Sequence, residues 1–257
     1  MKVTILGSGP SSGIPTIHDG WGDCDPENPR NRRLRPSILI ENGDTVVLVD
    51  TSPDLRQQML NTGVRRLDAV LYTHGHADHL HGIDDLRGIN KAMNAELPVY
   101  GDAATLATIN QRFDYTVTPL APGVDFYYKP VLNLHEIAPG DRFTIGDLDI
   151  LTFDQDHGFS RTLGYRFGPL AFTTDLVALP EQSFAAIEGV ETWIIGVFSI
   201  KPHMTHTHVD QALEWIERIK PARAILTHLG PSIDYAKLNE YLPGGVEAAY
   251  DGMEIEV

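Results

Sequence analysis

The sequence predicts an α/β fold in a single domain over residues 1–257. Strand patterns and helix patterns alternate along the chain, and no linker, repeat or low-complexity run interrupts them. The length of 257 residues suits one sandwich domain or two small ones, and the 42% content of hydrophobic residues is ordinary for a globular chain. This alternation is compatible with a layered α/β protein, but periodicity alone does not select one architecture.

The individual elements follow from local patterns. Apolar runs bounded by polar or turn residues predict strands, and apolar residues at helical spacing predict helices. We expect strands at 1–7, 38–40, 46–49, 69–72, 148–153, 163–167, 170–173, 193–195 and 224–227. We expect helices at 53–60, 78–93 and 209–219. Asn42-Gly43 and Gly168-Pro169 are turn sequences, so the strands on either side of each should pair as hairpins.

Residues 73–79 carry the strongest chemical signal in the chain. They read Thr-His-Gly-His-Ala-Asp-His and directly follow the strand predicted at 69–72. Ligands are well held at such a place, because the strand fixes the backbone while the loop lets side chains converge. Imidazole and carboxylate groups suit zinc, manganese or iron, and two alternating pairs suit two ions rather than one. The motif therefore predicts a metal site at His74, His76, Asp78 and His79.

This motif is the His-x-His-x-Asp-His signature of the metallo-β-lactamase superfamily, which the chain resembles over nearly its whole length. Proteins of that family fold as an αββα sandwich and carry their metals at one edge, between the two sheets. The resemblance implies further ligands at three later strand ends, namely His157, Asp175 and His228.

The resemblance also implies how the ligands are shared between two divalent ions, which we expect to be zinc or manganese. One ion would be held by His74, His76 and His157. The other would be held by Asp78, His79 and His228. Asp175 would lie between the two ions and bridge them.

Within the superfamily the chain looks most like the phosphodiesterases of the carbon–phosphorus lyase pathway, which open phosphoribosyl 1,2-cyclic phosphate. The similarity rests on the glycine-rich opening at 6–15, on Trp21-Gly22, on Thr174-Asp175 with Leu179-Pro180, and on the closing stretch 250–254. It implies a phosphodiesterase that opens small cyclic phosphodiesters, with a hydroxide held between the two metals as the nucleophile.

The same likeness suggests roles for individual residues. Asp78 would act in catalysis as well as in metal binding. His206 would protonate the leaving group or contact the phosphate, and His203 and His208 in the same cluster would contact the substrate. Exposed loop histidines without a role are the plainer interpretation of this cluster.

Two regions depart from that family. Its members hold a structural zinc with three cysteines and a histidine, whereas Asp23 and Asp25 stand here in place of two of the cysteines. Pro231 stands near the place of the histidine, so we expect no structural zinc. Gly196 stands where an acidic residue is expected, which bears on the substrate contacts and leaves the metal ligands unaffected.

Charge limits the partners that the chain can have. The formal net charge of -15 argues against general binding of nucleic acid, because the phosphate backbone would be repelled at long range. A local exception is the cluster of Arg30, Arg32, Arg33 and Arg35. A solvated basic loop and a guanidinium clamp for phosphate both fit this cluster, and the clamp would assign Arg33 and Arg35 to substrate binding.

Cellular context follows from what the sequence lacks. Residues 1–7 start a strand pattern and not a signal peptide, and no segment has the apolar length of a membrane span. The single cysteine, Cys24, cannot form an internal disulfide. We therefore expect a cytoplasmic protein with a small-molecule phosphodiester substrate and with no nucleic-acid or membrane partner; a homodimer stays open.

Three other functions stay open at this point. A thioester or lactone hydrolase would use the same metals on a carbonyl carbon and would need neither the arginine clamp nor His206. A tRNA 3′-end endonuclease would need an exposed basic arm, which this acidic chain does not contain. A non-catalytic accessory protein of cofactor biosynthesis shares the glycine-rich opening, but such proteins can lose metal ligands that are all present here.

Overall fold

The computed structural model describes residues 1–257, which form two seven-stranded β-sheets. The first sheet has the order β14-β1-β2-β3-β4-β5-β6, with β1 at Lys2–Gly7, β2 at Ser37–Asn42, β3 at Thr45–Val49, β4 at Ala69–Leu71, β5 at Leu97–Gly101, β6 at Leu132–Glu136 and β14 at Glu254–Glu256. The second sheet has the order β13-β12-β11-β10-β9-β8-β7, with β7 at Arg142–Ile145, β8 at Leu148–Asp156, β9 at Arg161–Phe167, β10 at Leu170–Thr173, β11 at Thr192–Gly196, β12 at Arg223–Thr227 and β13 at Val246–Ala248.

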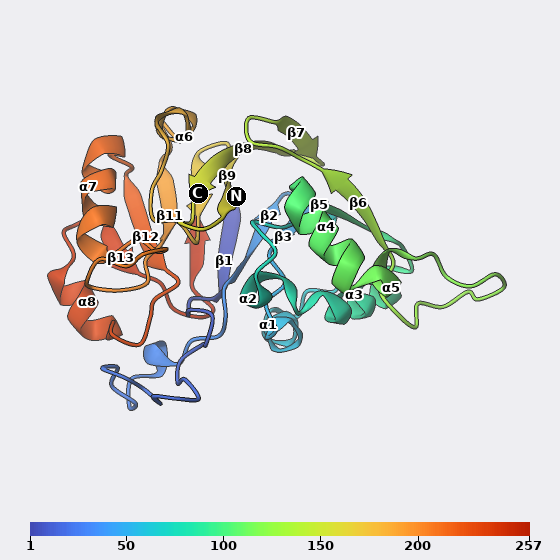
Figure 1. Ribbon diagram of the computed structural model, residues 1–257, viewed down its shortest axis with the longest axis horizontal. Coiled ribbons are helices and arrows are strands. Elements are labelled where there is room, and N and C mark those ends of the chain that lie inside the picture. The colour runs from blue at the N-terminus through green and yellow to red at the C-terminus, as the bar shows by residue number, and fades with distance from the viewer.

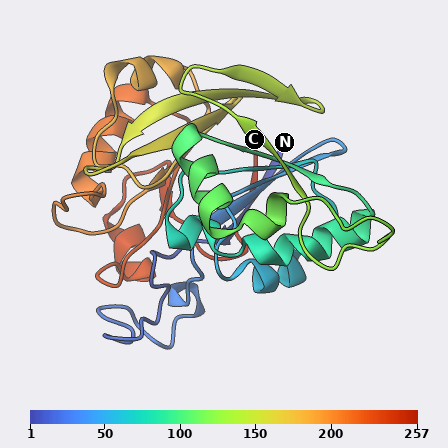
Figure 2. The same ribbon diagram turned by 45° about the vertical axis from the view of Figure 1, so that its right-hand side comes forward.

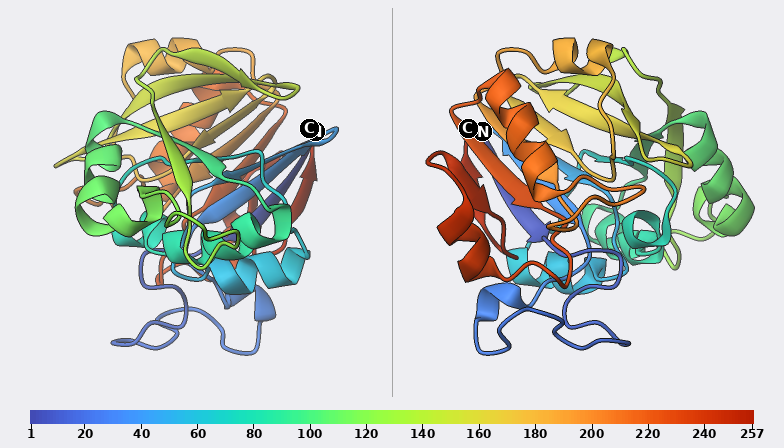
Figure 3. Two further views of the ribbon diagram at one scale, coloured as in Figure 1. Left: turned by 90° about the vertical axis from the view of Figure 1, so that its right-hand side faces the viewer. Right: turned by 60° about the vertical axis from the view of Figure 1, so that its left-hand side comes forward.

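Helices cover the outer face of each sheet (Figures 2 and 3). The α-helices are α1 at Leu55–Thr62, α2 at Ala77–Leu80, α3 at Leu86–Met93, α4 at Ala103–Arg112, α5 at Asp114–Val117, α6 at Glu181–Ala186, α7 at Val209–Ile219 and α8 at Tyr235–Tyr241. Two short 3-10 helices, η1 and η2, lie at Pro29–Asn31 and Ile83–Asp85. The architecture is an αββα sandwich of the metallo-β-lactamase type, and the predicted fold class is confirmed.

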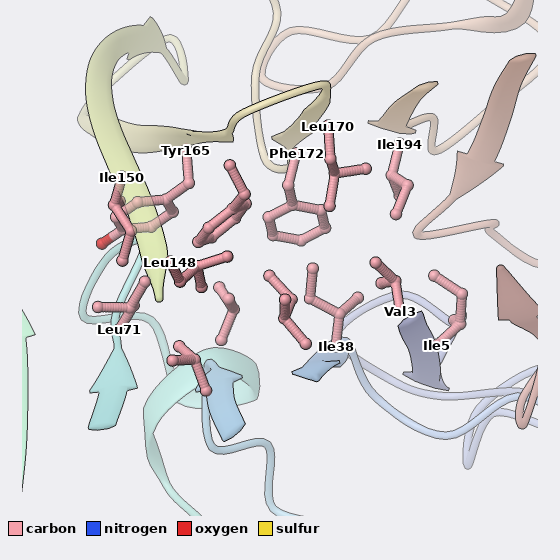
Figure 4. Close-up of a cluster of buried hydrophobic side chains, with 14 of the residues drawn as sticks. Val3, Ile5, Ile38, Leu71, Leu148, Ile150, Tyr165, Leu170, Phe172 and Ile194 are labelled. Carbon is pink, nitrogen blue, oxygen red and sulfur yellow. The ribbon is translucent and has the colours of Figure 1, made fainter. Parts of the chain in front are cut away.

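The sandwich is held together by the apolar side chains between its two sheets (Figure 4). Successive side chains of a strand point to opposite faces, so Val3 and Ile5 of β1 point inward as neighbours on one face. They and Ile38 meet Leu170 and Phe172 of the opposite sheet in a cluster of 22 buried residues. Full burial of each such side chain contributes about 1.5–3 kcal/mol, so this layer fixes how the sheets are stacked.

The outer faces of the sheets bury a second set of apolar residues under the helices. Leu48 and Val70 belong to a cluster with Leu55 of α1 and Leu86 of α3. On the other sheet, Trp193 packs in a cluster with residues of α6, α7 and α8, the last two of which lie on the outer side in Figure 3. Strands that are apolar on both faces are typical of sheets covered by helices.

Most of the predicted elements agree with the structure. The helix predicted at 209–219 coincides with α7, and the two predicted hairpins pair as antiparallel strands, β2 with β3 and β9 with β10. The helix predicted at 53–60 begins later, at Leu55, and ends at Thr62. The strands predicted at 148–153 and 193–195 are longer in the structure, as β8 and β11.

The prediction of one helix over 78–93 is wrong. The segment breaks into α2, η2 and α3 around Gly82. A side chain at Gly82 would place its Cβ 2.0 Å from the carbonyl oxygen of Ser52, so the chain turns here against the backbone that follows β3. The break separates α2 from α3. The one-turn helix α2 carries two residues of the metal motif, whereas α3 contributes apolar side chains to a buried cluster.

The two ends of the chain lie side by side (Figure 1), and β1 pairs with β14 in antiparallel register. Asp251, just before β14, fastens the glycine-rich loop that follows β1. Its carboxylate accepts hydrogen bonds from the Ser8 amide and hydroxyl, each at 2.8 Å, and from the Leu34 amide at 2.6 Å. No helix of the structure has the length and apolarity that crossing a membrane requires.

Candidate metal centre

The residues predicted as metal ligands gather at one edge of the sandwich, near α2 in Figure 1. His74 follows β4, His157 follows β8, Asp175 follows β10 and His228 follows β12. Strands β8, β10 and β12 run in the same direction, and their carboxyl ends therefore lie at one edge of the second sheet. The single turn of α2 adds Asp78 and His79 to the same edge.

Three residues at this edge have a left-handed backbone, which is unusual for residues other than glycine. The φ angles are 65° at Asp50, 50° at Asp175 and 58° at His228. Such a conformation costs about 1–2 kcal/mol per residue and persists only where the surrounding structure imposes it. Each of these residues lies at or just after the end of a buried strand, so the turn there aims its side chain into the site.

The side chains form two groups of potential ligands that share one member. The first group is His74, His76, His157 and Asp175, and the second is Asp78, His79, His228 and Asp175. In each group the ligand atoms lie within 4.8 Å of one another. These are the seven residues named from the sequence, in the same two sets.

Asp175 turns a different oxygen to each group. Its Oδ2 lies 3.5 Å from Nε2 of His74 and 3.5 Å from Nε2 of His157. Its Oδ1 lies 3.4 Å from Nε2 of His79 and 3.0 Å from Nε2 of His228. One carboxylate therefore serves both groups, as a bridging ligand would.

The donor geometry fits a divalent cation in each group. The atoms just described are 3.0–3.5 Å apart, close to the edge of about 3.4 Å of a tetrahedron whose ligands lie about 2.1 Å from a zinc ion. Four of the ligand atoms are buried without a hydrogen-bond partner, namely Nε2 of His74, His79 and His228 and Oδ2 of Asp78. Buried polar atoms are rarely left unpaired, so this set fits metal ligands.

The buried charged groups at the site also bear on whether it can bind metal. Burial by itself would raise the pKa of Asp175, but the surrounding His228 and His79 hold it well below its usual range. Burial lowers the pKa of His74 and His76, which favours the neutral imidazole that binds metal. At His79 and His228 burial acts in the same direction, but the carboxylates of Asp175 and Asp78 outweigh it and raise the pKa. No lysine or arginine forms an ion pair with Asp175, so two buried carboxylates (Asp78 is the other) lack a cationic side chain.

Three of the histidines have a hydrogen-bond partner at their other ring nitrogen, and for His74 this partner is the hydroxyl of Thr73, 3.0 Å from Nδ1. Nδ1 of His79 lies 2.6 Å from Oδ2 of Asp50, and Nδ1 of His157 lies 2.7 Å from the carbonyl oxygen of Thr205. Both acceptors fix the tautomer that leaves Nε2 free to bind a metal. Asp50 was not named from the sequence, although a carboxylate at the end of the strand at 46–49 was a signal for it.

The histidines near α7 fall into different places. The ring of His206 lies 4.8 Å from that of His157 and 5.2 Å from that of His228, and His206 lines the cleft over the two ligand groups. Burial lowers its pKa to about 3. His203 is exposed, with its ring 5.2 Å from that of His206. His208 is the N-cap residue of α7 and does not line the cleft.

The structure contradicts the prediction that Arg33 binds substrate. Arg33 is 1% exposed, and its guanidinium donates to the carbonyl oxygens of Leu229 at 3.2 Å and Ile233 at 2.8 Å. It also donates to Oδ1 of Asn31 at 3.1 Å. The guanidinium of Arg33 is therefore occupied by acceptors inside the protein. Arg33 connects the loop before β2 to the loop after β12 and is a structural residue.

The other arginines of the cluster are also engaged. Arg35 pairs with Asp54 through both of its carboxylate oxygens, at 2.9 and 2.7 Å. The guanidinium of Arg30 lies 4.4 Å from the ring centre of Tyr250, and that of Arg32 lies 5.0 Å from the ring of Trp21. The arginine clamp expected at this loop is not formed, and Arg35 is not among the residues that line the cleft.

The two departures from the family have structural counterparts. Cys24 is buried, and its thiol donates to the carbonyl oxygen of Ile233 at 3.2 Å. A Cβ at Gly196 would lie 3.0 Å from Cα of Thr174, so a larger residue there would push on the turn that carries Asp175. Gly196 therefore leaves room for the turn that places Asp175 between the two ligand groups.

The cleft over the ligand groups has a volume of about 480 Å³. Besides ligand residues and His206, it is lined by Ser11 of the glycine-rich loop, Ala77, Phe159, Ser160 and Thr205. None of these was named from the sequence. Ala77 lies within the metal motif but has no ligand atom, and the other four come from loops whose paths depend on contacts between distant segments.

The fold and the two groups of candidate ligands are those of the metallo-β-lactamase type. A family model described as the β-lactamase superfamily domain matches residues 45–229, and the chain belongs to this superfamily. A solved structure described as a new diphosphatase from the PhnP family superposes with a TM-score of 0.90 and 31% identity, over 99% of this chain and 96% of that one.

Two curated relatives carry other names. An octanoyltransferase from Porphyromonas gingivalis is 34% identical over 261 residues, which cover 99% of this chain and 51% of that protein. A ribonuclease Z from Methanopyrus kandleri is 30% identical over 141 residues, covering 54% of this chain and 45% of that protein. The matches span about half the length of each of these relatives, and the names differ from one relative to the next.

Proposed function

We propose that this protein is a dinuclear metal-dependent phosphodiesterase that opens small, including cyclic, phosphodiesters. The observation that carries the proposal is Asp175, whose two carboxylate oxygens each face a separate group of ligands. Two-metal sites of this kind suit phosphoryl transfer because they can stabilise both the attacking and the leaving oxygen. The likeness to a diphosphatase of the PhnP family supports chemistry at phosphorus.

The chain supplies the surroundings that this chemistry needs. His74, His76 and His157 would hold one ion, Asp78, His79 and His228 the other, with Asp175 shared between them. Bound divalent ions would lower the pKa of coordinated water and neutralise charge on phosphoryl oxygens. Ser11, Ser160 and Thr205 line the cleft and carry hydroxyl groups that could donate hydrogen bonds to a bound ester.

His206 is the candidate proton donor in this scheme. Its ring stacks on that of His228, with 5.2 Å between the centres, and it lines the cleft without belonging to either ligand group. A side chain in that position can contact a phosphoryl oxygen. Because burial lowers its pKa to about 3 in the ligand-free cleft, His206 can give a proton to a departing alkoxide only if the bound phosphate raises that pKa. His203 lies behind it at the exposed rim and is better placed to support His206 than to contact the reacting group.

A panel of substrates tests this proposal. We expect hydrolysis of bis(p-nitrophenyl) phosphate and of small cyclic phosphodiesters in the presence of manganese or zinc. Asp175→Ala should abolish this activity, whereas the exposed matched variant Asp149→Ala should retain it. Diester hydrolysis that survives Asp175→Ala, or none with either metal, would contradict the assignment.

The net charge of -15 leads us to propose small substrates over long RNA. A long polyanion is repelled by the overall field, and a small ester is much less affected. Incubation of the protein with a precursor tRNA and, separately, with a small cyclic phosphodiester distinguishes the two. Efficient 3′-end cleavage of the tRNA would support the endonuclease named in the ribonuclease Z relative.

A thioester hydrolase is the second candidate, and one specific observation favours it. The relative at 34% identity is named for transfer of an octanoyl group, although the chain matches only half of that protein and the transfer is not assigned to the matched half. The same metals could activate water against a carbonyl carbon. An octanoyl thioester and a lactone therefore belong in the panel, and a higher kcat/KM for either than for every phosphodiester would favour this candidate.

A further inference from the structure

The cleft over the metal ligands contains no cationic side chain. Apart from the ligands and His206, its lining residues are Ser11, Ala77, Phe159, Ser160 and Thr205, and all are uncharged. A second phosphate on the substrate, away from the reacting centre, would therefore find no lysine or arginine in the cleft. The chain's net charge of -15 would disfavour it further.

Two arginines near the cleft already have other partners, namely Arg161, next to Ser160 in the sequence, and Arg35, whose pKa is raised mainly by Asp54 and which is close enough to Asp78 for that carboxylate to contribute. Arg161 follows the cleft residue Ser160 and forms ion pairs with Asp154 and with Asp156, the latter at 3.1 Å. Arg35 is paired with Asp54. Neither guanidinium is free to bind a distal phosphate without breaking an ion pair.

Phe159 is the one large apolar side chain of the cleft lining, and it is 85% exposed. It lies at the tip of the hairpin between β8 and β9, two residues after the ligand His157. The tip is held by hydrogen bonds from the His157 amide to the carbonyl oxygen of Ser160 and from the Phe159 amide to that of His157, each at 3.0 Å.

The neighbouring glycine fixes this tip against the rest of the protein. Gly158 has a φ of 78°, and a Cβ there would lie 2.9 Å from the carbonyl oxygen of Met204. The tip of the hairpin therefore lies against the loop that carries His206. Only glycine at position 158 allows the two loops to come so close. The ring of Phe159 thus lies exposed at the cleft on a supported loop, where a planar group of a ligand can stack on it.

We propose that Phe159 is a specificity-determining residue that stacks on a planar aromatic group of the substrate, and that the cleft selects diesters without a further phosphate. This inference rests on the proposed phosphodiesterase function. The reacting phosphoryl group would lie at the metal ligands. The ring of Phe159 would stack on the ester group that stays on the phosphorus after the leaving group departs.

Paired substrates with one leaving group test the stacking. Methyl p-nitrophenyl phosphate and phenyl p-nitrophenyl phosphate both release p-nitrophenolate, so their ratio of kcat/KM isolates the retained group. We expect the wild type to prefer the phenyl ester, Phe159→Ala to reduce this preference about tenfold, and Phe159→Leu to retain part of it. Phe126→Ala, at another exposed phenylalanine outside the cleft, is the matched control and should leave the ratio unchanged.

A third ester tests the charge. The 4-carboxyphenyl analogue adds an anion to the retained ring, and we expect its kcat/KM to fall below that of the phenyl ester. An equal phenyl preference in the wild type and Phe159→Ala, or a gain from the added carboxylate, would overturn the inference.

A binding measurement separates this inference from the proposed function. Calorimetry with diphenyl phosphate and dimethyl phosphate, on the metal-loaded protein, does not depend on turnover. Tighter binding of diphenyl phosphate that is lost in Phe159→Ala would support the stacking even if no diester were hydrolysed, in which case the proposed function alone would fail. Equal binding of the two ligands by the wild type would overturn the stacking.

Discussion

The ring nitrogen Nδ1 of His79 donates a hydrogen bond to Oδ2 of Asp50 over 2.6 Å, and both side chains are fully buried. The direction of this bond follows from the other contacts of Asp50, whose carboxylate also accepts from the amide and the hydroxyl of Thr73, each at 2.8 Å. His79 therefore presents Nε2, and not Nδ1, to Asp78 and Asp175.

Asp50→Asn should weaken metal binding without removing any ligand. The amide group of asparagine would face donors at His79 and Thr73, so the tautomer of His79 would no longer be fixed. We expect metal affinity to fall about 10–100-fold, as is typical for residues that orient a ligand. Competition with a chromogenic chelator measures it, and the exposed Asp149→Asn serves as control. Unchanged affinity in Asp50→Asn would show that the bond does not orient the ligand.

His206→Ala should slow turnover far more than it weakens metal binding. A general acid contributes about 10²–10⁴-fold, and this contribution should shrink on esters with good leaving groups, which depart without a proton. Comparing p-nitrophenyl esters with alkyl esters measures the difference. An equal loss on both kinds of ester would reassign His206 to phosphate binding or to structure.

Arg33→Ala should reduce stability, in contrast to the substrate-binding role that the sequence suggested. Removal of the guanidinium leaves the buried carbonyl oxygen of Leu229 without a donor, and it takes from the carbonyl oxygen of Ile233 one of two donors, the other being the Cys24 thiol. We expect a loss of about 3 kcal/mol in the free energy of unfolding. Urea denaturation measures it, with the exposed Arg32→Ala as control. A stable Arg33→Ala variant with a raised KM for phosphodiesters would restore the original assignment.

The sequence alone was enough to name the seven candidate metal ligands, but it was not enough to name the residues that line and support the site. His74, His76, Asp78 and His79 form a contiguous motif, and their chemistry is visible without a structure. His157, Asp175 and His228 follow predicted strands, and the family resemblance placed them in the right order. The structure brings these residues together with the motif, and they could be found in the sequence because strand ends are local features.

The residues that sequence reasoning missed or misjudged depend on contacts between distant segments. Arg33 and Arg35 lie in one basic cluster, yet the burial of Arg33 against the loop after β12 cannot be read from composition. Phe159 looks like any loop residue until the hairpin tip is seen beside the cleft. Gly82 looked like a tolerated interruption of a helix, and only its approach to Ser52 shows why the helix ends.

Asp251 should make stability depend on pH. Burial raises the pKa of this carboxyl from 3.8 to about 6 in the folded protein. The folded state therefore binds the proton more tightly than the unfolded state, and the stabilisation from this proton is lost as pH rises through about 6. Over about two pH units this amounts to about 3 kcal/mol.

Comparison of the wild type with Asp251→Asn isolates this group, because both proteins share every other titrating residue. Urea denaturation between about pH 4 and 7, in the same metal state, should show the stability of the wild type relative to the variant falling as pH rises. A difference that stays flat across this range would mean that the carboxyl titrates normally.

The metal content of the protein tests the central claim most directly. Elemental analysis of protein prepared without chelator should find about two transition-metal ions per chain, since two groups of nitrogen and oxygen ligands share Asp175. Asp175→Ala should reduce this number, and the exposed Asp149→Ala should leave it unchanged. A content near one ion per chain in the wild type, unaffected by Asp175→Ala, would contradict the dinuclear site.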